Sequence, residues 1–62
     1  MPDVIERHYT TAELAELLAV HPETIRRLAA SGELPSVRVG AERRYPHSGV
    51  LDYLRRHRED AA

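Results

Sequence analysis

The chain has no cysteine among its 62 residues, which excludes both a disulfide framework and a thiolate zinc site. A chain of this length forms one small domain, and packing alone must stabilise it. The sequence also lacks an apolar run near the roughly 18 residues of a membrane span, and its opening segment MPDVIERHYT has no signal-like apolar stretch. We therefore expect a soluble protein of the cytoplasm with no membrane contact.

The residue spacings of common enzymes are absent as well. His8, His21, His47 and His57 do not have metal-ligand spacing, and Ser48 has no evident base and acid partner. No glycine-rich phosphate loop is present. The sequence therefore predicts no enzymatic activity, no catalytic residue, no metal site and no cofactor.

Lysine is missing too, so all nine basic residues are arginine. This reflects either coding bias in a GC-rich genome or a need for planar, forked hydrogen-bond donors. The net charge of −1 is unevenly spread: residues 1–20 carry −3, residues 21–47 carry +2, and the remaining residues are balanced. The positive charge is concentrated in the middle of the chain.

The segment TTAELAELLAV predicts a first helix. Thr10 and Glu13 have the spacing of a capping box, and Leu14, Ala15 and Leu18 form one apolar stripe. Pro22 predicts the start of a second helix, because proline suits the first helical position. The residues expected in the core from this second part are Val20, Ile25, Leu28 and Ala29. Gly32 is a natural left-handed stop.

Two such helices, a linker of about three residues and the small Ala15 are typical of a helix-turn-helix. The alternative is an ordinary helical hairpin. In the second helix Glu23, Arg26, Arg27 and Ala30 are expected to turn outward.

The segment ELPSVRVGAERRYP predicts a β-hairpin with a turn at Gly40-Ala41-Glu42. We expect three of its side chains to pack on the helices, namely Val37, Val39 and Tyr45. Arg38 and Arg44 are then expected on the far face, with Arg43 near the tip. The arginines either keep the edge soluble or make the hairpin a wing that contacts phosphates or a minor groove. The preceding helices favour the wing.

A final helix is predicted after Pro46, with Val50, Leu51 and Leu54 buried and Tyr53 at the margin. The basic run that follows is interpreted as a solvated face or a complement to the helix dipole. Within it, Arg55 is a candidate phosphate contact.

From Tyr9 to Leu54 the pattern resembles the excisionase family of small winged helix-turn-helix DNA-binding domains. That family is related to the N-terminal domains of MerR-type regulators and to BldC-type developmental regulators of actinobacteria. The pieces TAELAELLAV, ETIRRLAASGELPSVRVG and RRYP carry the resemblance in family order and spacing. It implies a mainly α fold with a small β-hairpin, a winged helix-turn-helix over residues 9–58, an N-terminal tail over 1–8 and a C-terminal tail over 59–62.

The resemblance also implies that the second helix enters the major groove while the wing contacts flanking backbone or minor groove. Carried over by position, this implicates Glu23, Thr24, Arg26 and Arg27 in the helix and Arg38, Arg43 and Arg44 in the wing. A guanidinium can donate two hydrogen bonds to guanine O6 and N7. Thr24 either contacts a thymine methyl or a phosphate, or bonds its local backbone.

Three positions depart from the family pattern. His21 stands where the family often has serine or aspartate, so we expect a poorer helix cap there and retain His21 as a candidate phosphate contact. Glu42 occupies a wing-tip position that is frequently basic, and Ala41 replaces a common glycine. The wing is therefore expected to bind more weakly than the family average.

We expect the protein to be without the coiled coil of MerR-type regulators, and a lone module with few cations binds DNA weakly and with strong salt dependence. The resemblance implies a monomer in solution that assembles cooperatively, head to tail, on repeated sites of double-stranded DNA. The favoured role is an excisionase-like recombination directionality factor, bacterial or phage-encoded, which bends DNA and acts with an integrase or other recombinase. The alternatives are a small MerR-like or BldC-like transcription regulator and, more distantly, a protein-interaction module.

Overall fold

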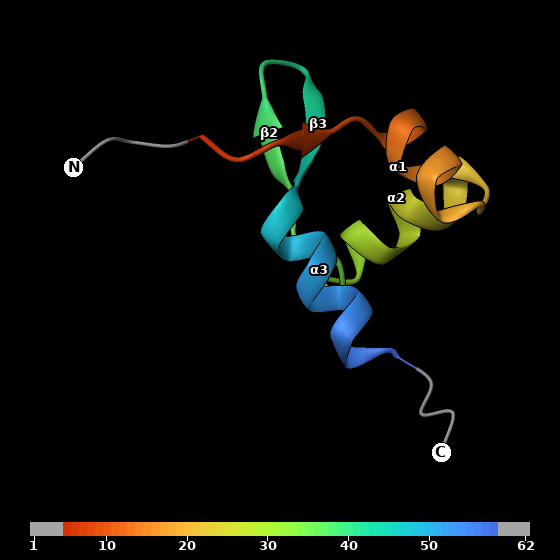
Figure 1. The fold of residues 1–62 in the computed structure, drawn as a ribbon. Helices are drawn as coiled ribbons and strands as arrows, with labels where there is room; N and C mark the ends of the chain where they lie inside the picture. Colours follow the sequence, from red (N-terminus) through yellow and green to blue (C-terminus); the bar gives the residue numbers. More distant parts are fainter. Residues whose placement is uncertain (1–4, 59–62) are drawn as a thin grey trace.

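The computed structural model describes residues 5–58, which form three helices and a three-stranded antiparallel sheet. In chain order the elements are β1 (His8–Tyr9), α1 (Thr11–Leu18), α2 (Pro22–Ala30), β2 (Val37–Val39), β3 (Glu42–Pro46) and α3 (His47–Arg56). Figure 1 shows α1 and α2 crossing on one side of the sheet, while the tip of the β2–β3 hairpin and the end of α3 point in opposite directions. The predicted winged helix-turn-helix fold is confirmed.

Both predicted helix boundaries of the helix-turn-helix are present. Thr10 and Glu13 cap each other's backbone N–H groups at 3.0 Å, so α1 begins with the expected capping box. Its C-cap is Ala19, which has a left-handed φ of 58°, and α2 begins with Pro22. The chain leaves α2 through Gly32, whose φ of 86° confirms the predicted stop.

The sheet has the order β1-β3-β2, with β3 in the centre. The strand β1 is absent from the sequence-based prediction, which places residues 1–8 in a tail. It pairs His8 with Pro46 and Tyr9 with Tyr45. Just before it, the Glu6 carboxylate accepts hydrogen bonds from the backbone N–H and the hydroxyl of Ser48 at 2.7 and 3.0 Å. Glu6 thereby caps α3, which has no side-chain cap from its own preceding residue.

The core lies between the helices and the inner side of β3. Its buried side chains are Tyr9, Leu14, Ala15, Ile25, Ala29, Leu34, Tyr45 and Val50. Leu18, Leu28 and Tyr53 pack against it while remaining partly accessible. The predicted burial of Leu14, Ala15, Ile25 and Tyr45 is confirmed, whereas the burial of Leu34 and Tyr9 was not anticipated.

Five residues predicted to be buried or packed on the helices are exposed instead: Val20, Val37, Val39, Leu51 and Leu54. Val20 lies beyond the left-handed turn that ends α1, outside the helical stripe. The two β2 valines pair with β3 residues on the side opposite Tyr45, so they face solvent. On α3 the buried side is formed by Gly49, Val50 and Tyr53, so the apolar stripe is rotated from the predicted one.

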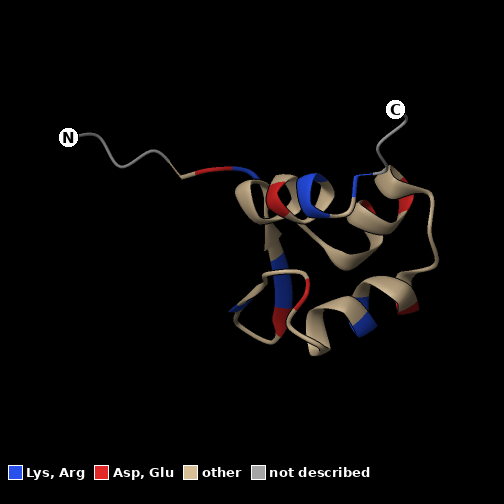
Figure 2. Cartoon of the chain, turned by 90° about the horizontal axis from the view of Figure 1, so that it is seen from below, with Lys and Arg blue, Asp and Glu red and all other residues tan. Residues whose placement is uncertain are grey.

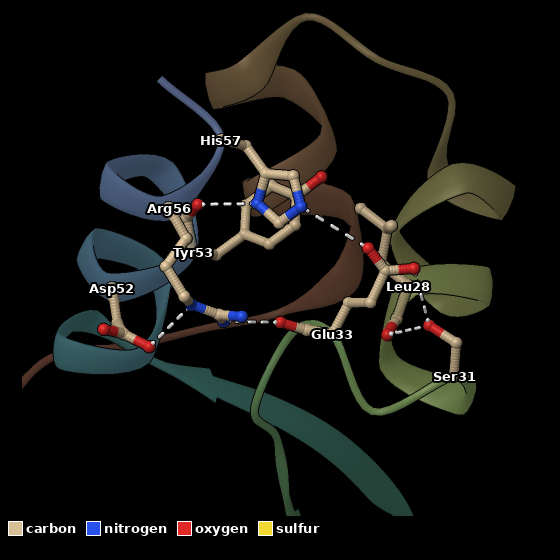
Figure 3. A network of polar contacts seen from close by, with 7 residues as sticks. All are labelled: Leu28, Ser31, Glu33, Asp52, Tyr53, Arg56 and His57. Atoms are coloured by element: carbon tan, nitrogen blue, oxygen red, sulfur yellow. Dashed lines mark hydrogen bonds and ion pairs between the residues drawn. The ribbon is translucent and has the colours of Figure 1, made fainter. Parts of the chain in front are cut away.

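The end of α3 is held against the turn that follows α2 (Figure 3). Arg56 pairs with Asp52 at 3.1 Å and donates a hydrogen bond to the backbone carbonyl of Glu33 at 3.0 Å. His57 stacks on Tyr53 with the ring centroids 4.2 Å apart, and its Nε2 lies 3.5 Å from the Glu33 carboxylate. Part of the predicted basic run therefore joins α3 to the α2–β2 turn.

Candidate nucleic-acid interface

The outer edge of α2 carries the polar side chains of the second helix. Ile25 and Ala29 are buried, whereas Glu23, Arg26 and Arg27 are exposed. This split follows from helical geometry, because residues four apart share one face. Packing of α2 on α1 therefore turns the two arginines away from the core.

His21 is the N-cap of α2, and its Nδ1 accepts a hydrogen bond from the backbone N–H of Glu23 at 3.1 Å. An imidazole nitrogen thus takes the place of the usual hydroxyl or carboxylate oxygen, and the expectation that it caps more weakly than serine or aspartate stays a prediction. The tautomer that accepts at Nδ1 carries its proton on Nε2. The exposed ring thus keeps one N–H donor for an external acceptor.

The two adjacent arginines of α2 differ in their surroundings. Arg26 forms an exposed ion pair with Glu23 at 3.1 Å, a contact that contributes little to stability but orients the guanidinium. Arg27 forms neither a hydrogen bond through its side chain nor an ion pair with any residue in the described range 5–58. Thr24 is half-buried, and its hydroxyl forms no hydrogen bond with any residue in the same range. The local backbone bond considered for Thr24 is therefore not formed.

We call the β2–β3 hairpin the wing. Its two-residue turn, in which Gly40 has a φ of 64°, pairs Val39 with Glu42 and therefore Arg38 with Arg43. Residues directly opposite each other lie on the same side of a sheet. The expectation that Arg38 and Arg44 share the far face is therefore wrong.

Arg38 lies with Arg43 and Tyr45 on the side that turns toward the helices, as the complete burial of Tyr45 shows. Arg44 lies with Val37 on the other side. The prediction placed Glu42 in a three-residue turn, which aligns Arg38 with Arg44. In the structure the turn is Gly40-Ala41 and Glu42 begins β3, so the register shifts by one residue.

The three wing arginines are engaged to different degrees. Arg44 pairs with Glu42, so part of its charge is offset at the wing tip. Arg43 donates a hydrogen bond to the neutral hydroxyl of Ser36 at 2.9 Å. Arg38 is exposed and has no ion-pair partner within the part of the chain that the structure describes. Arg38 and Arg43 thus keep their full charges on one side of the wing.

An open groove of about 550 Å³ separates the wing from the helices. Its lining residues are Thr10, Thr11, Ala12, Arg26, Arg38, Ala41, Glu42, Arg43, Arg44 and Tyr45. The Thr11 and Tyr45 hydroxyls share a hydrogen bond of 3.1 Å between its walls. Figure 2 shows arginine segments on both α2 and the wing, which lie beside each other in that view. Four arginines and one glutamate line the groove, so it attracts anions.

The remaining candidates do not join this groove. Arg55 lies exposed in the last turn of α3 and is not among the lining residues. Arg27 is also outside the lining set, on the exposed edge of α2. Among residues 5–58 no three histidine or acidic side chains are placed to hold a metal ion. The helices within this range are too short or too polar to cross a membrane.

Sequence reasoning missed the polar contacts that Thr11, Ser36 and the Tyr45 hydroxyl make at the groove. Thr11 and Tyr45 form the contact between its walls, and Ser36 orients Arg43. The pairing of Arg38 with Arg43 follows from the length of the turn, because a turn of two residues rather than three places them opposite each other. The contribution of Thr11 depends on the position of α1 against β3, and no local pattern reports it.

Together, the helix pair, the central β3 strand and the arginine-bearing hairpin define a small winged helix-turn-helix domain. The sequence model of a family described as "Helix-turn-helix domain" matches residues 9–58, so the chain belongs to that family. Helix-turn-helix domains bind DNA, and membership implies the same for this chain. No curated protein and no solved structure matches the chain in the other two comparisons.

Proposed function

We propose that the protein binds double-stranded DNA in a sequence-specific way and acts as an excisionase-like recombination directionality factor. In this proposal the exposed edge of α2, with Glu23, Thr24, Arg26 and Arg27, enters the major groove. The wing arginines contact the flanking backbone or minor groove. His21 and Arg55 are secondary phosphate contacts.

One observation carries the DNA-binding part: α2 and the wing present arginines along two sides of one open groove. A DNA-reading helix needs uncommitted donors for base edges, and Arg27 has them. A wing needs cations that are not neutralised within the protein, and Arg38 and Arg43 meet that condition.

For the favoured role we further propose that monomers assemble head to tail on repeated sites, bend the DNA and act with an integrase in a bacterium or phage. A domain this small makes few phosphate contacts, so occupation of adjacent sites supplies the missing affinity. The exposed Leu17, Leu51 and Leu54 are apolar surface on which neighbouring copies can meet. A small MerR-like or BldC-like transcription regulator would use the same DNA contacts, so it is retained as the alternative role.

The first experiment selects duplexes from a randomised library and measures binding of the winners by fluorescence anisotropy across a salt series. We expect an enriched repeated motif, tighter binding to it than to its scrambled version, and affinity that falls linearly in a plot of log K against log salt. Absence of binding to any duplex at low salt would contradict the proposal and favour a protein-interaction module.

The role is tested separately from binding. Gel mobility of a bound site placed at different positions along a fragment reports bending, and titration over one, two or three motif copies reports cooperativity. An integrase gene beside the coding sequence and integrase-dependent excision in vitro support the directionality factor. Promoter repression without any effect on excision supports the regulator.

A further inference from the structure

Two arginines occupy directly opposed positions of the wing. The hairpin register places Arg38 directly opposite Arg43 on the side that turns toward the helices. Like charges at directly opposed positions destabilise a two-stranded pair. Within the described residues no carboxylate pairs with either guanidinium, and the bond from Arg43 goes to the uncharged Ser36. Apart from the bond between Arg43 and Ser36, the contacts of the described residues show no folding role for this pair.

The other acidic and basic groups around the groove are arranged differently. Glu42 lines the groove but is paired with Arg44. Glu23 pairs with Arg26, which reaches the groove from the α2 side. The two carboxylates thus offset the two cations at the margins and leave the Arg38 and Arg43 charges unopposed.

The groove has room for a ligand between these groups. Its volume of about 550 Å³ lies within the range of roughly 300 to 1,000 Å³ that ligand sites occupy. A phosphodiester is an anion with unesterified oxygens that can accept hydrogen bonds from two guanidinium groups at once. Such an anion relieves the repulsion between them, so its binding is favoured most where the cations already face each other.

We propose that Arg38 and Arg43 hold one shared phosphate of a single DNA strand, which runs through the groove between the wing and α2. The inference rests on the proposed DNA binding and deepens it. Arg26 contacts the same strand from the opposite wall, while Arg27, outside the groove, remains directed at base edges. In this arrangement, the DNA strand that lies between the major groove at α2 and the minor groove at the wing binds in the groove of the protein.

The test compares the wild-type protein with Arg38→Gln, the double variant Arg38→Gln/Arg43→Gln and the control Arg58→Gln, all on one duplex from the selection above. Each phosphate neutralised contributes about 0.9 to the slope of log K against log salt. Because the pair shares one phosphate, the double variant should lower the slope by about 0.9, whereas two separate phosphates predict a drop of about 1.8. Arg58→Gln removes the same charge from an exposed site away from the groove and should leave the slope unchanged.

A positional measurement locates the contact. Neutral methylphosphonates replace one phosphate at a time, and one position should weaken wild-type binding while having no further effect on the double variant. A thermal melt supplies the second readout: Arg38→Gln should unfold at or above the wild-type midpoint, because the substitution removes the repulsion.

The outcomes separate the two proposals. If no duplex is bound by the wild-type chain, the proposed function itself fails. If the wild type binds but the double variant keeps its slope, or loses about 1.8, the shared phosphate is refuted while DNA binding stands. A lower melting point for Arg38→Gln also overturns the inference, because it shows that the facing arginines stabilise the free protein.

Discussion

In the helix pair α1–α2 the helix starts are capped and the apolar interior is buried, whereas the wing leaves valine and arginine side chains exposed or without a carboxylate partner. Thr10, Glu13 and His21 cap the two helices, and Leu14 and Ile25 are fully buried between them. In the wing, by contrast, two valines are exposed and two arginines face each other without a carboxylate.

This difference separates residues that fold the domain from residues that bind its ligand. Changes in the helix pair should act on the free energy of unfolding, and changes in the wing and on the outer edge of α2 should act on DNA affinity. Arg27 belongs with the wing in this division, although it lies on α2, because its side chain has no partner within residues 5–58.

The largest expected effect is on the core of the helix pair. Leu14→Ala removes a side chain with no exposed surface and should lower the free energy of unfolding by about 2 to 5 kcal/mol. Leu17→Ala makes the same chemical change where the side chain is 62 % exposed and should have little effect. Urea denaturation followed by circular dichroism measures both. Equal losses would show that α1 is not packed as described.

The second effect concerns sequence discrimination. Arg27→Ala should reduce the preference for the selected motif over its scrambled version by roughly 1 to 3 kcal/mol, the value of one bidentate guanine contact. Its thermal midpoint should stay close to that of the wild type, because the side chain is exposed. Parallel anisotropy titrations on the two duplexes give the ratio of the two dissociation constants. A uniform loss on both would assign Arg27 to the backbone instead.

The sequence predicts the helix pair better than it predicts the packing of α3. The helix pair was predicted well because Thr10, Glu13, Pro22 and Gly32 are local signals whose geometry needs no distant partner. The exposed Leu51 and Leu54 were misjudged because the buried side of α3 depends on how that helix docks.

The arginine constellation of the candidate site was predictable, but its arrangement was not. The positions Arg38, Arg43 and Arg44 follow from the hairpin pattern, whereas their distribution over two faces depends on strand register. Strand β1 has only two residues and no periodicity to detect, so its pairing with β3 arises from the tertiary fold.

A smaller effect is expected at the turn of the helix pair. Ala19 adopts a left-handed φ of 58°, which costs a residue with a Cβ atom about 1 to 2 kcal/mol. Ala19→Gly removes that cost at some expense in unfolded-state entropy, so a net gain of about 0.5 to 1 kcal/mol is expected. Ala30→Gly, at the exposed last residue of α2, should instead lose a smaller amount of stability. Thermal denaturation compares the pair, and a loss in both would mean that the turn is not left-handed.

One substitution in the wing is expected to strengthen DNA binding. Glu42→Gln frees Arg44 from its ion pair and should strengthen binding to every duplex by roughly 0.2 to 1 kcal/mol, the size of an exposed ion pair. The salt dependence should become steeper, since one more cation meets the DNA. Glu16→Gln makes the same charge change on exposed α1 and serves as the control. Equal gains from both variants would reflect net charge alone.

The smallest change is expected at Glu6, where the folded domain extends beyond the helix pair and the wing. The backbone N–H of Ser48 lowers the pKa of this carboxyl below its ordinary value of 4.5, and the Ser48 hydroxyl, His8 and His47 add to the effect. A depressed folded-state pKa means that the cap stabilises fully above pH 4.5 and is lost as the pH falls through the lower folded value. Glu6→Gln should therefore reduce the thermal midpoint slightly at neutral pH, and the gap to the wild type should close in acid. Because Glu6 caps α3 from outside both the helix pair and the DNA contacts, the same variant should bind DNA normally. A gap that persists unchanged in acid would show that the carboxylate charge is not what holds α3 to the amino end of the chain.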